Sequence, residues 1–230
     1  MALPDAGAAQ RSPDGGVPVA RDIGAATAAN RRLLADFFDR LTDEQLTTPS
    51  LCSAWTVREV LGHLVMPFTG SLGGFAVQLV KARGSLDRAS AATACDLARR
   101  PVLELTALLR ENAEVTIKAP GVGPMGQLAD ACVHLRDCAR PLGLSDDVDL
   151  DDWRMLLDWL PPRVPGLVPR RRLAGLRLVA TDQEWSWGEG PEVRGPSEAL
   201  AMAAVGRPVA LGDLGGPGVD VLRARLHHDG

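Results

Sequence analysis

The sequence predicts a mostly α protein with a small α/β part at its C-terminal end. Between about residues 21 and 145, apolar residues recur at three- and four-residue steps in roughly four long segments, the pattern of helices in series. Beyond residue 147, short alternating segments separated by Gly and Pro favour short strands mixed with short helices. We therefore expect a helix bundle over residues 21–147 and an α/β domain over residues 148–230. Residues 1–20, rich in Ala, Gly, Pro and Asp, are expected to form a disordered tail.

The first helix is expected to begin after Asp22, whose side chain can cap the free N–H groups of a first turn. Apolar side chains repeat with helical spacing over residues 23–41, which predicts an amphipathic helix. Thr42 and Gln45 then have the spacing of a capping box, in which each side chain accepts from the other residue's backbone N–H. A short helical turn through residue 46 follows from that spacing.

A second capping box, formed by Thr56 and Glu59, is expected to open the next helix. Residues 57–68 carry a strong apolar stripe at helical spacing. Pro67 lacks a backbone N–H and should kink or end this segment. The apolar run within residues 70–84 is expected to continue the same helix.

Two further helical regions complete the predicted bundle. The third covers about residues 91–117, where Pro101 is expected either to interrupt the helix or to occupy its first position. The fourth covers residues 126–143 and is bracketed by Gly126 and Pro141, which leaves room for about four turns.

The C-terminal part is expected to alternate short helices and strands. Ser197 is predicted to cap a helix that Gly206 closes. The expected elements are a helix over residues 153–160, strands over 176–181 and 192–194, and helices over 197–205 and 220–226.

The fourth helix carries an acid and an imidazole four residues apart. Asp130 and His134 lie about 40° from each other around a helix and therefore share one face. Such a pair can supply two ligands to one metal ion inside a bundle, but it is also a common surface charge pair. His63 lies on the second helix, off the centre of the apolar stripe, and a solvated histidine is the alternative there.

Composition excludes several classes of partner. The net charge is −4, and the only basic run, Arg170 to Arg172, is short, so nucleic acid is not expected as a partner. No apolar run reaches the roughly 18 residues that a membrane span needs, and the N-terminus has no apolar core of a secretory signal. We expect a cytoplasmic protein without a membrane partner.

The cysteines support the same compartment. No two form a Cys-x-x-Cys pair, so we expect four reduced thiols that act mainly as small core residues. Cys138 follows His134 by one helical turn, which leaves open a place near the site. The four are Cys52, Cys95, Cys132 and Cys138.

Three groups of residues resemble one known family. The stretch Leu51–Leu64 resembles the signature C-x-x-W-T-V-x-x-x-x-x-H-L of DinB-like, mycothiol-dependent proteins of the maleylpyruvate isomerase type. The segment Asp130–Asp137, followed by Arg140-Pro-Leu-Gly, is similar to that family's second metal segment. The third group resembles the family's C-terminal domain and consists of Leu178–Asp182, Trp185–Pro191, Gly195-Pro and Gly206-Arg-Pro. Together the three groups span roughly residues 25 to 226.

The resemblance implies a DinB-like four-helix bundle followed by a sterol-carrier-like C-terminal domain. It also implies a divalent metal, usually zinc, held by His63, Asp130 and His134. The acid of the best-described members is a glutamate, so Asp130 is one methylene shorter. Asp137, one turn after His134, is expected either to orient a ligand histidine or to be a surface charge at the end of the helix.

The leading hypothesis is an enzyme that uses a divalent metal and mycothiol to isomerise a small electrophile or to transfer sulfur to it. Three protein ligands leave an open metal position, and a thiol bound there loses its proton. The alternative is a non-catalytic metal-binding or sensing protein of the same fold. Under either hypothesis we expect a monomer or homodimer. The C-terminal domain around Trp185 and Trp187 is expected to cover the mouth of the site. Candidate clamps for a substrate carboxylate, none ranked above the others, are Arg194, Arg207, Arg223 and Arg225.

Overall fold

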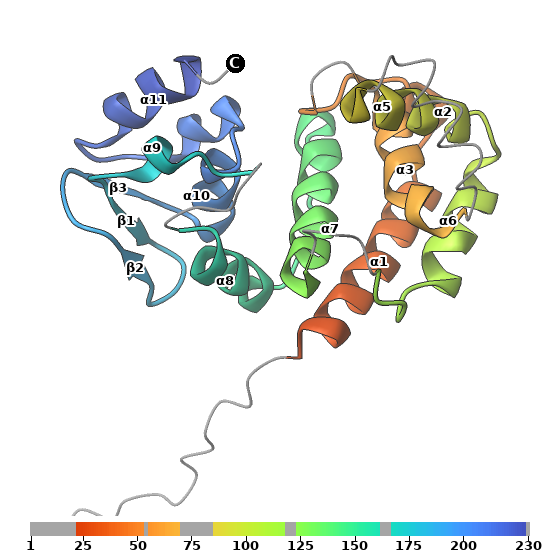
Figure 1. The fold of residues 1–230 in the computed structure, drawn as a ribbon, viewed down its shortest axis with the longest axis horizontal. Coiled ribbons are helices and arrows are strands. Elements are labelled where there is room, and N and C mark those ends of the chain that lie inside the picture. The colour runs from red at the N-terminus through yellow and green to blue at the C-terminus, as the bar shows by residue number, and fades with distance from the viewer. Residues whose placement is uncertain (1–21, 53–54, 70–84, 118–122, 162–166, 229–230) are drawn as a thin grey trace, which may run out of the picture.

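The computed structural model describes residues 22–52, 55–69, 85–117, 123–161 and 167–228. These residues are mostly helical and include one small three-stranded sheet, which confirms the predicted fold class. Figure 1 shows the helices of the first half on one side and the sheet with its own helices on the other. The expected tail over residues 1–20 and the expected helix over residues 70–84 lie outside the described residues.

The first half is built from helices that pack around one apolar core (Figure 1). Side chains without any exposed surface, among them Phe38, Leu61, Leu105 and Leu135, bring α1, α3, α6 and α7 together there. The helices of this half are α1 (Ile23–Asp39), α2 (Asp43–Leu46), α3 (Val57–Val65), α5 (Leu86–Leu97), α6 (Val102–Glu111) and α7 (Pro124–Ala139).

The expected caps of the first helices are present. The Asp22 side chain accepts from the backbone N–H of Ala25 at 2.8 Å and caps α1. Both capping boxes form, Thr42 with Gln45 at the start of α2 and Thr56 with Glu59 at the start of α3. Local side-chain chemistry therefore sets where these helices begin.

Prolines set several of the helix limits. Pro101 is the N-cap of α6, so the third predicted region is interrupted and forms α5 and α6 as separate helices. Pro67 lies in η1 (Met66–Phe68), a 3₁₀ turn that follows α3.

The last helix of the first half ends at a glycine. The helix α7 continues into η2 (Arg140–Leu142), and Gly143 ends η2 in the left-handed conformation at φ 66°.

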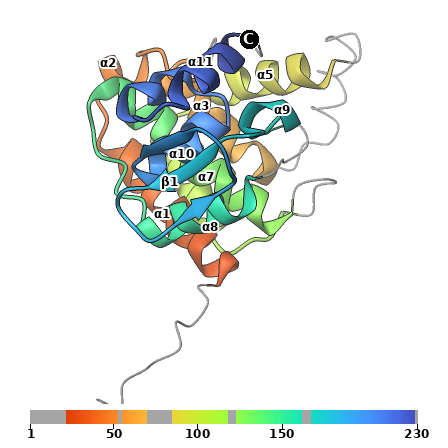
Figure 2. The same ribbon diagram turned by 90° about the vertical axis from the view of Figure 1, so that its left-hand side faces the viewer.

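The second half contains a sheet in the order β2-β1-β3, with β2 antiparallel and β3 parallel to β1. Figures 1 and 2 show this sheet on the side of α10 that faces away from α7. Its elements are α8 (Leu150–Trp159), α9 (Arg170–Leu173), β1 (Arg177–Ala180), β2 (Ser186–Trp187), β3 (Glu192–Gly195), α10 (Ser197–Ala204), η3 (Pro208–Asp213) and α11 (Val219–His228).

One sequence-based assignment at α10 is wrong. The N-cap is Pro196, and Ser197 is the first helical residue, fully buried. Its hydroxyl donates to Asp182 Oδ1 at 2.6 Å and accepts from Gln183 Nε2 at 2.6 Å. Ser197 thus ties α10 to the turn after β1, because the tertiary partner competes with the local cap.

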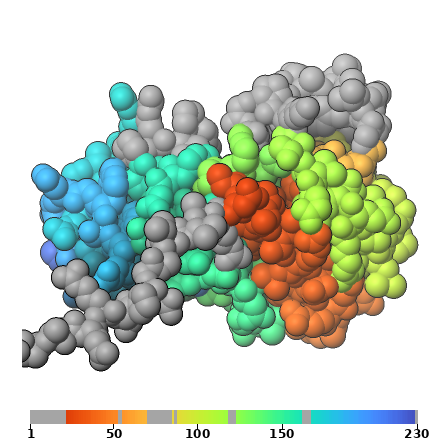
Figure 3. Space-filling model, turned by 90° about the horizontal axis from the view of Figure 1, so that it is seen from below, coloured from red at the N-terminus to blue at the C-terminus, as the bar shows by residue number. Residues whose placement is uncertain are grey.

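The helix α7 belongs to both cores. Its residues Ala131 and Leu135 pack with the first half, whereas Leu128 and Val133 pack with α8 and the second half. A buried hydrogen bond from Asn30 Nδ2 to Asp152 Oδ2, 2.7 Å long, also joins α1 to α8. Figure 3 shows the second half, coloured blue, at one end of this face and the first half, coloured red to yellow-green, at the other. The division at residue 147 stays a prediction.

None of the described helices is long and apolar enough to cross a membrane.

Candidate metal centre

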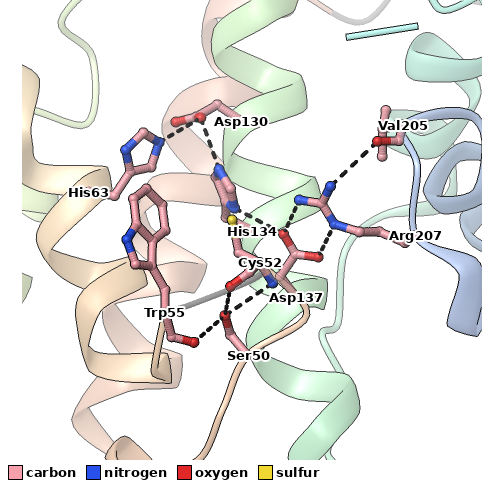
Figure 4. Close-up of polar contacts among 9 residues, drawn as sticks. All are labelled: Ser50, Cys52, Trp55, His63, Asp130, His134, Asp137, Val205 and Arg207. Carbon is pink, nitrogen blue, oxygen red and sulfur yellow. Dashed lines mark hydrogen bonds and ion pairs between the residues drawn. The ribbon is translucent and has the colours of Figure 1, made fainter. Parts of the chain in front are cut away.

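Three side chains from two helices of the first half converge. His63 comes from α3, whereas Asp130 and His134 come from successive turns of one face of α7 (Figure 4). The Nε2 atoms of both histidines lie 3.4 Å from the same Asp130 oxygen, Oδ1. One ligand-capable atom from each residue lies within 4.8 Å of the other two. The structure therefore brings together all three sequence-predicted ligands.

The triangle fits a tetrahedral metal ion. Ligand atoms bonded at about 2.1 Å around a tetrahedral zinc lie about 3.4 Å from one another. Both nitrogen–oxygen separations have that value. Two imidazole nitrogens and one carboxylate oxygen are also the donor types of zinc sites that keep a fourth position open.

The rings of the two histidines are held by different neighbours. His63 stacks against Trp55, with ring centroids 5.0 Å apart, and its Nδ1 is buried without a hydrogen-bond partner among the described residues. The other proposed ligand, His134, faces Asp137 Oδ2 with its Nδ1, at 3.0 Å. A proton on that Nδ1 leaves the lone pair of Nε2 directed at the triangle.

Electrostatics couples the acid to the imidazoles. Burial disfavours the ionised form of Asp130, but the hydrogen bonds from His134 and His63 outweigh burial and hold its pKa well below the usual range. Burial likewise disfavours the His134 cation, and the hydrogen bonds to Asp130 and Asp137 outweigh it and raise its pKa to about 10. In the absence of an ion, this centre therefore holds a proton that a metal must displace.

Asp137 is fully buried, with 0% of its side chain exposed, which rules out the surface-charge alternative. Its two oxygens accept from Arg207 in a bidentate pair, Oδ1 from Nε at 2.8 Å and Oδ2 from Nη2 at 2.7 Å. Burial raises the pKa of Asp137, and the hydrogen bonds from Arg207 and His134 more than reverse this, so the carboxylate stays charged. Asp137 thus links an arginine of the second half to a proposed ligand of the first (Figure 4).

Comparison with known proteins identifies the family of this chain. A family model described as the mycothiol maleylpyruvate isomerase N-terminal domain matches residues 27–178. The chain belongs to this family. The match contains all three proposed ligands, whereas Arg207 lies beyond it.

One solved structure is similar to this family member over most of its length. It is a crystal structure of the mycothiol-dependent maleylpyruvate isomerase in which a histidine is mutated to alanine. The likeness covers 85% of this chain and 91% of that one, with a TM-score of 0.52 and 10% sequence identity. At this identity the likeness shows a shared fold. No match was found among curated proteins.

Four arginines were candidate carboxylate clamps in this member of the mycothiol maleylpyruvate isomerase family. Of these four, only Arg207 lies at the proposed centre, and its guanidinium is already paired with Asp137. Arg194 pairs with Glu192. Arg223 pairs with Asp220, and Arg225 donates to backbone carbonyls of the second half. The sequence gave no basis for ranking the four arginines, because the burial of Arg207 beside Asp137 depends on a tertiary contact.

Neither tryptophan of the C-terminal domain lies at the proposed centre. Trp185 lies in the core of the second half and donates from Nε1 to Asp158 of α8 at 2.8 Å. Trp187 pairs with Leu178 within the sheet, which lies on the side of α10 away from α7 (Figure 2). A tryptophan that does touch the centre is Trp55, which lies just before α3 and contacts His63.

The thiols of this family member are all free, and one lies near the centre. Cys52 is half-buried and has its sulfur close to His134 and Asp137, a position that its sequence context alone did not reveal. Burial raises the pKa of the Cys52 thiol, with the neighbouring carboxylates adding to this and the neighbouring cations opposing it. Cys138 is a buried core residue whose thiol pKa is raised further by burial. Neither thiol is poised to be a nucleophile.

Proposed function

We propose that this protein is an enzyme that uses a divalent metal, zinc or a similar ion, and mycothiol to act on a small electrophile by isomerisation or sulfur transfer. The observation that carries the proposal is the triangle of His63 Nε2, His134 Nε2 and Asp130 Oδ1, with its two separations of 3.4 Å. Its spacing and donor types suit a metal ion with one position left open for a thiol. Membership in the mycothiol maleylpyruvate isomerase N-terminal domain family supports the choice of thiol.

The two cysteines nearest the centre favour a reactive sulfur from outside the chain. Burial raises the pKa of the Cys52 and Cys138 thiols, which disfavours their thiolate forms, and the proposal therefore assigns the reactive sulfur to mycothiol. A divalent ion at the centre would bind such a thiol and favour its thiolate at neutral pH.

The chemistry of the proposed reaction needs no oxidant. The thiolate adds to the β carbon of an activated double bond, a C–S bond forms, and the π electrons move to the carbonyl oxygen. Rotation about the resulting single bond, followed by return of the electrons and loss of the thiolate, gives the isomer. When a leaving group is present instead, the sulfur displaces it and stays attached.

The residues of the chain have positioning roles in this scheme. Asp137 holds the Nδ1 proton of His134 and so directs Nε2 to the centre. Trp55 stacks on His63 and limits the rotation of its ring. Asp130 remains ionised, which supplies the negative ligand that balances part of the ion's charge.

A non-catalytic metal-binding function is the second candidate. It is favoured by one observation, the engagement of Arg207 by Asp137, which removes the nearest candidate for a substrate clamp. In that case the ion would bind with the same ligands, and no thiol would be consumed.

Turnover measurements distinguish the two candidates. Zinc-loaded protein is incubated with mycothiol and a panel of α,β-unsaturated carbonyl compounds and alkyl halides, and proton NMR follows isomers, adducts and free thiol. We expect thiol-dependent turnover of at least one compound, lost in His63→Ala and kept in His227→Ala, a change at an exposed histidine of α11. Normal zinc content without turnover of any compound would favour the binding function.

A further inference from the structure

Cys52 belongs to a second group of metal-binding side chains, on the other side of the His134 ring. One ligand-capable atom each of Cys52, His134 and Asp137 lies within 4.8 Å of the other two. Figure 4 shows the Cys52 sulfur beside the ring edge that carries Nδ1, whereas Nε2 faces Asp130. This group therefore shares only His134 with the proposed metal centre, and it uses the opposite ring nitrogen.

Backbone contacts hold Cys52 in this position. The Cys52 N–H donates to Ser50 Oγ at 3.1 Å. The N–H of the preceding residue, Leu51, donates to the carbonyl of Asp137 at 3.0 Å, which ties the loop to α7 at the residue that supplies the carboxylate. The sulfur is thus held against His134 by the fold, and a ligand has no loop to order before it binds.

The gap between His134 Nδ1 and Asp137 Oδ2 is close to the size that an ion needs. These two atoms lie 3.0 Å apart with a proton between them. Bonded at about 2.1 Å to a tetrahedral ion they would lie about 3.4 Å apart, so the exchange of the proton for an ion moves them by only about 0.4 Å. Oδ2 has two lone pairs and can keep its hydrogen bond from Arg207 Nη2 while it binds the ion.

Charge and donor type select the kind of ion. A coordinating thiol loses its proton, so the Cys52 thiolate and the Asp137 carboxylate would carry two negative charges against the one positive charge of Arg207. The thiolate is a soft ligand, whereas the triangle of the proposed metal centre offers only nitrogen and oxygen. A zinc-like ion suits the triangle, and a more thiophilic ion suits the group with sulfur.

We propose that Cys52, His134 and Asp137 form a second metal site, which takes a thiophilic ion such as Cd²⁺. An ion on Nδ1 leaves the remaining proton of the neutral imidazole on Nε2. Nε2 then has no lone pair for the proposed metal centre, so the two sites exclude each other through one ring. A thiophilic ion at the second site therefore inhibits any function that needs the first ion, whether that function is catalysis or metal binding.

Ultraviolet absorbance tests the sulfur ligand. Metal-free protein is titrated with Cd²⁺ in thiol-free buffer, and the charge-transfer band of a cadmium–thiolate bond is followed. We expect a saturable band in the wild-type protein and in His63→Ala, and its loss in Cys52→Ser and in His134→Ala. Cys95→Ser, at another half-buried free cysteine, which contacts Glu59 instead, should keep the band.

Nitrogen NMR of labelled wild-type protein tests the ring nitrogen without any variant. With equimolar Cd²⁺ we expect the His134 proton on Nε2, and with equimolar zinc we expect it on Nδ1. This measurement decides the question even if a substitution of Cys52 prevents folding, which circular dichroism would reveal.

Each outcome bears on the second site alone. No band in the wild-type protein, or a band that persists in folded Cys52→Ser, would overturn the inference. A band that needs Cys52 but not His134 would show a sulfur contact without the site and would overturn it as well. A His134 proton on Nδ1 in the cadmium-loaded wild-type protein would place the ion in the triangle, with the same consequence.

Discussion

Single side chains carry the proposed metal, and each ligand can be removed separately. His63→Ala and His134→Ala should each abolish stoichiometric zinc, because two remaining protein ligands rarely hold the ion against water and buffer. Asp130→Ala should weaken binding, whereas Asp130→Glu should keep it with an altered metal preference. Elemental analysis of the purified variants measures the ion, with His227→Ala as the control and circular dichroism as the check on folding. Full occupancy in folded His63→Ala and His134→Ala proteins would remove the assignment.

Asp137 should affect the metal through His134. Asp137→Asn keeps an oxygen near the Nδ1 of His134 but removes the charge that strengthens that contact. We expect the zinc affinity to fall by about tenfold or more, as measured by competition with a chromogenic chelator. Asp36→Asn, at an exposed aspartate that pairs with Arg110, provides the matched control. An unchanged affinity would show that Asp137 has only a structural role.

Proton competition makes metal binding depend on pH. The pKa of His134 is raised from 6.5 to about 10 in the ion-free protein, so the imidazole is protonated throughout the neutral range. The stabilisation from this proton is fully present below pH 6.5 and is lost as the pH rises through about 10. Between about pH 7 and 8.5 the apparent zinc affinity should therefore rise close to tenfold per pH unit. Calorimetry in two buffers of different ionisation enthalpy should detect about one proton released per ion; a pH-independent affinity would contradict this.

At the scale of the helices, Gly62 controls how closely α3 approaches α5. A β-carbon at this position would lie 2.2 Å from the carbonyl oxygen of Ala94, and both groups belong to helix backbones that cannot shift alone. Gly62→Ala should therefore push the helices apart, lower the unfolding free energy by about 1–3 kcal/mol and loosen zinc, because His63 is the next residue of α3. Denaturant unfolding and chelator competition measure the two effects. Gly212→Ala, where a β-carbon meets nothing within 4 Å, is the control, and equal stability of the two variants would disprove the argument.

Across the whole molecule, Arg207 and Asp137 join the two halves at a buried charge pair. Arg207→Met should lower the unfolding free energy by about 3–5 kcal/mol, because it leaves the Asp137 carboxylate buried without its bidentate partner. The double variant Asp137→Asn with Arg207→Met should recover part of that loss, since no buried charge remains. Denaturant unfolding measures both, and Arg223→Met, at an exposed pair with Asp220, should change stability by only about 0.5 kcal/mol or less. A loss for Arg207→Met as small as that of the control would contradict a buried linking pair.

The sequence by itself determined the fold class, the starts of α1, α2 and α3, and the shared face of Asp130 and His134. These features depend on contacts within a few residues, such as the two capping boxes, the prolines at helix ends and the four-residue spacing on α7. The resemblance to the family added His63 to the same site. The resemblance also predicted a C-terminal domain. In the structure, the second half of the chain contains a three-stranded sheet.

Only the tertiary structure decided which side chains of the two halves meet. His63 and Asp130 are 67 residues apart, and the family resemblance rather than a local pattern brought them together. Asp137 and Arg207 are 70 residues apart, and nothing in the sequence indicated their contact. The same limit explains why Ser197 was taken for a cap, and why four arginines could not be ranked. The partners of Ser197 and of Arg207 come from other elements of the fold. Packing buries Asp137 away from water, and the hydrogen bonds that its carboxylate loses to water are replaced by those from Arg207.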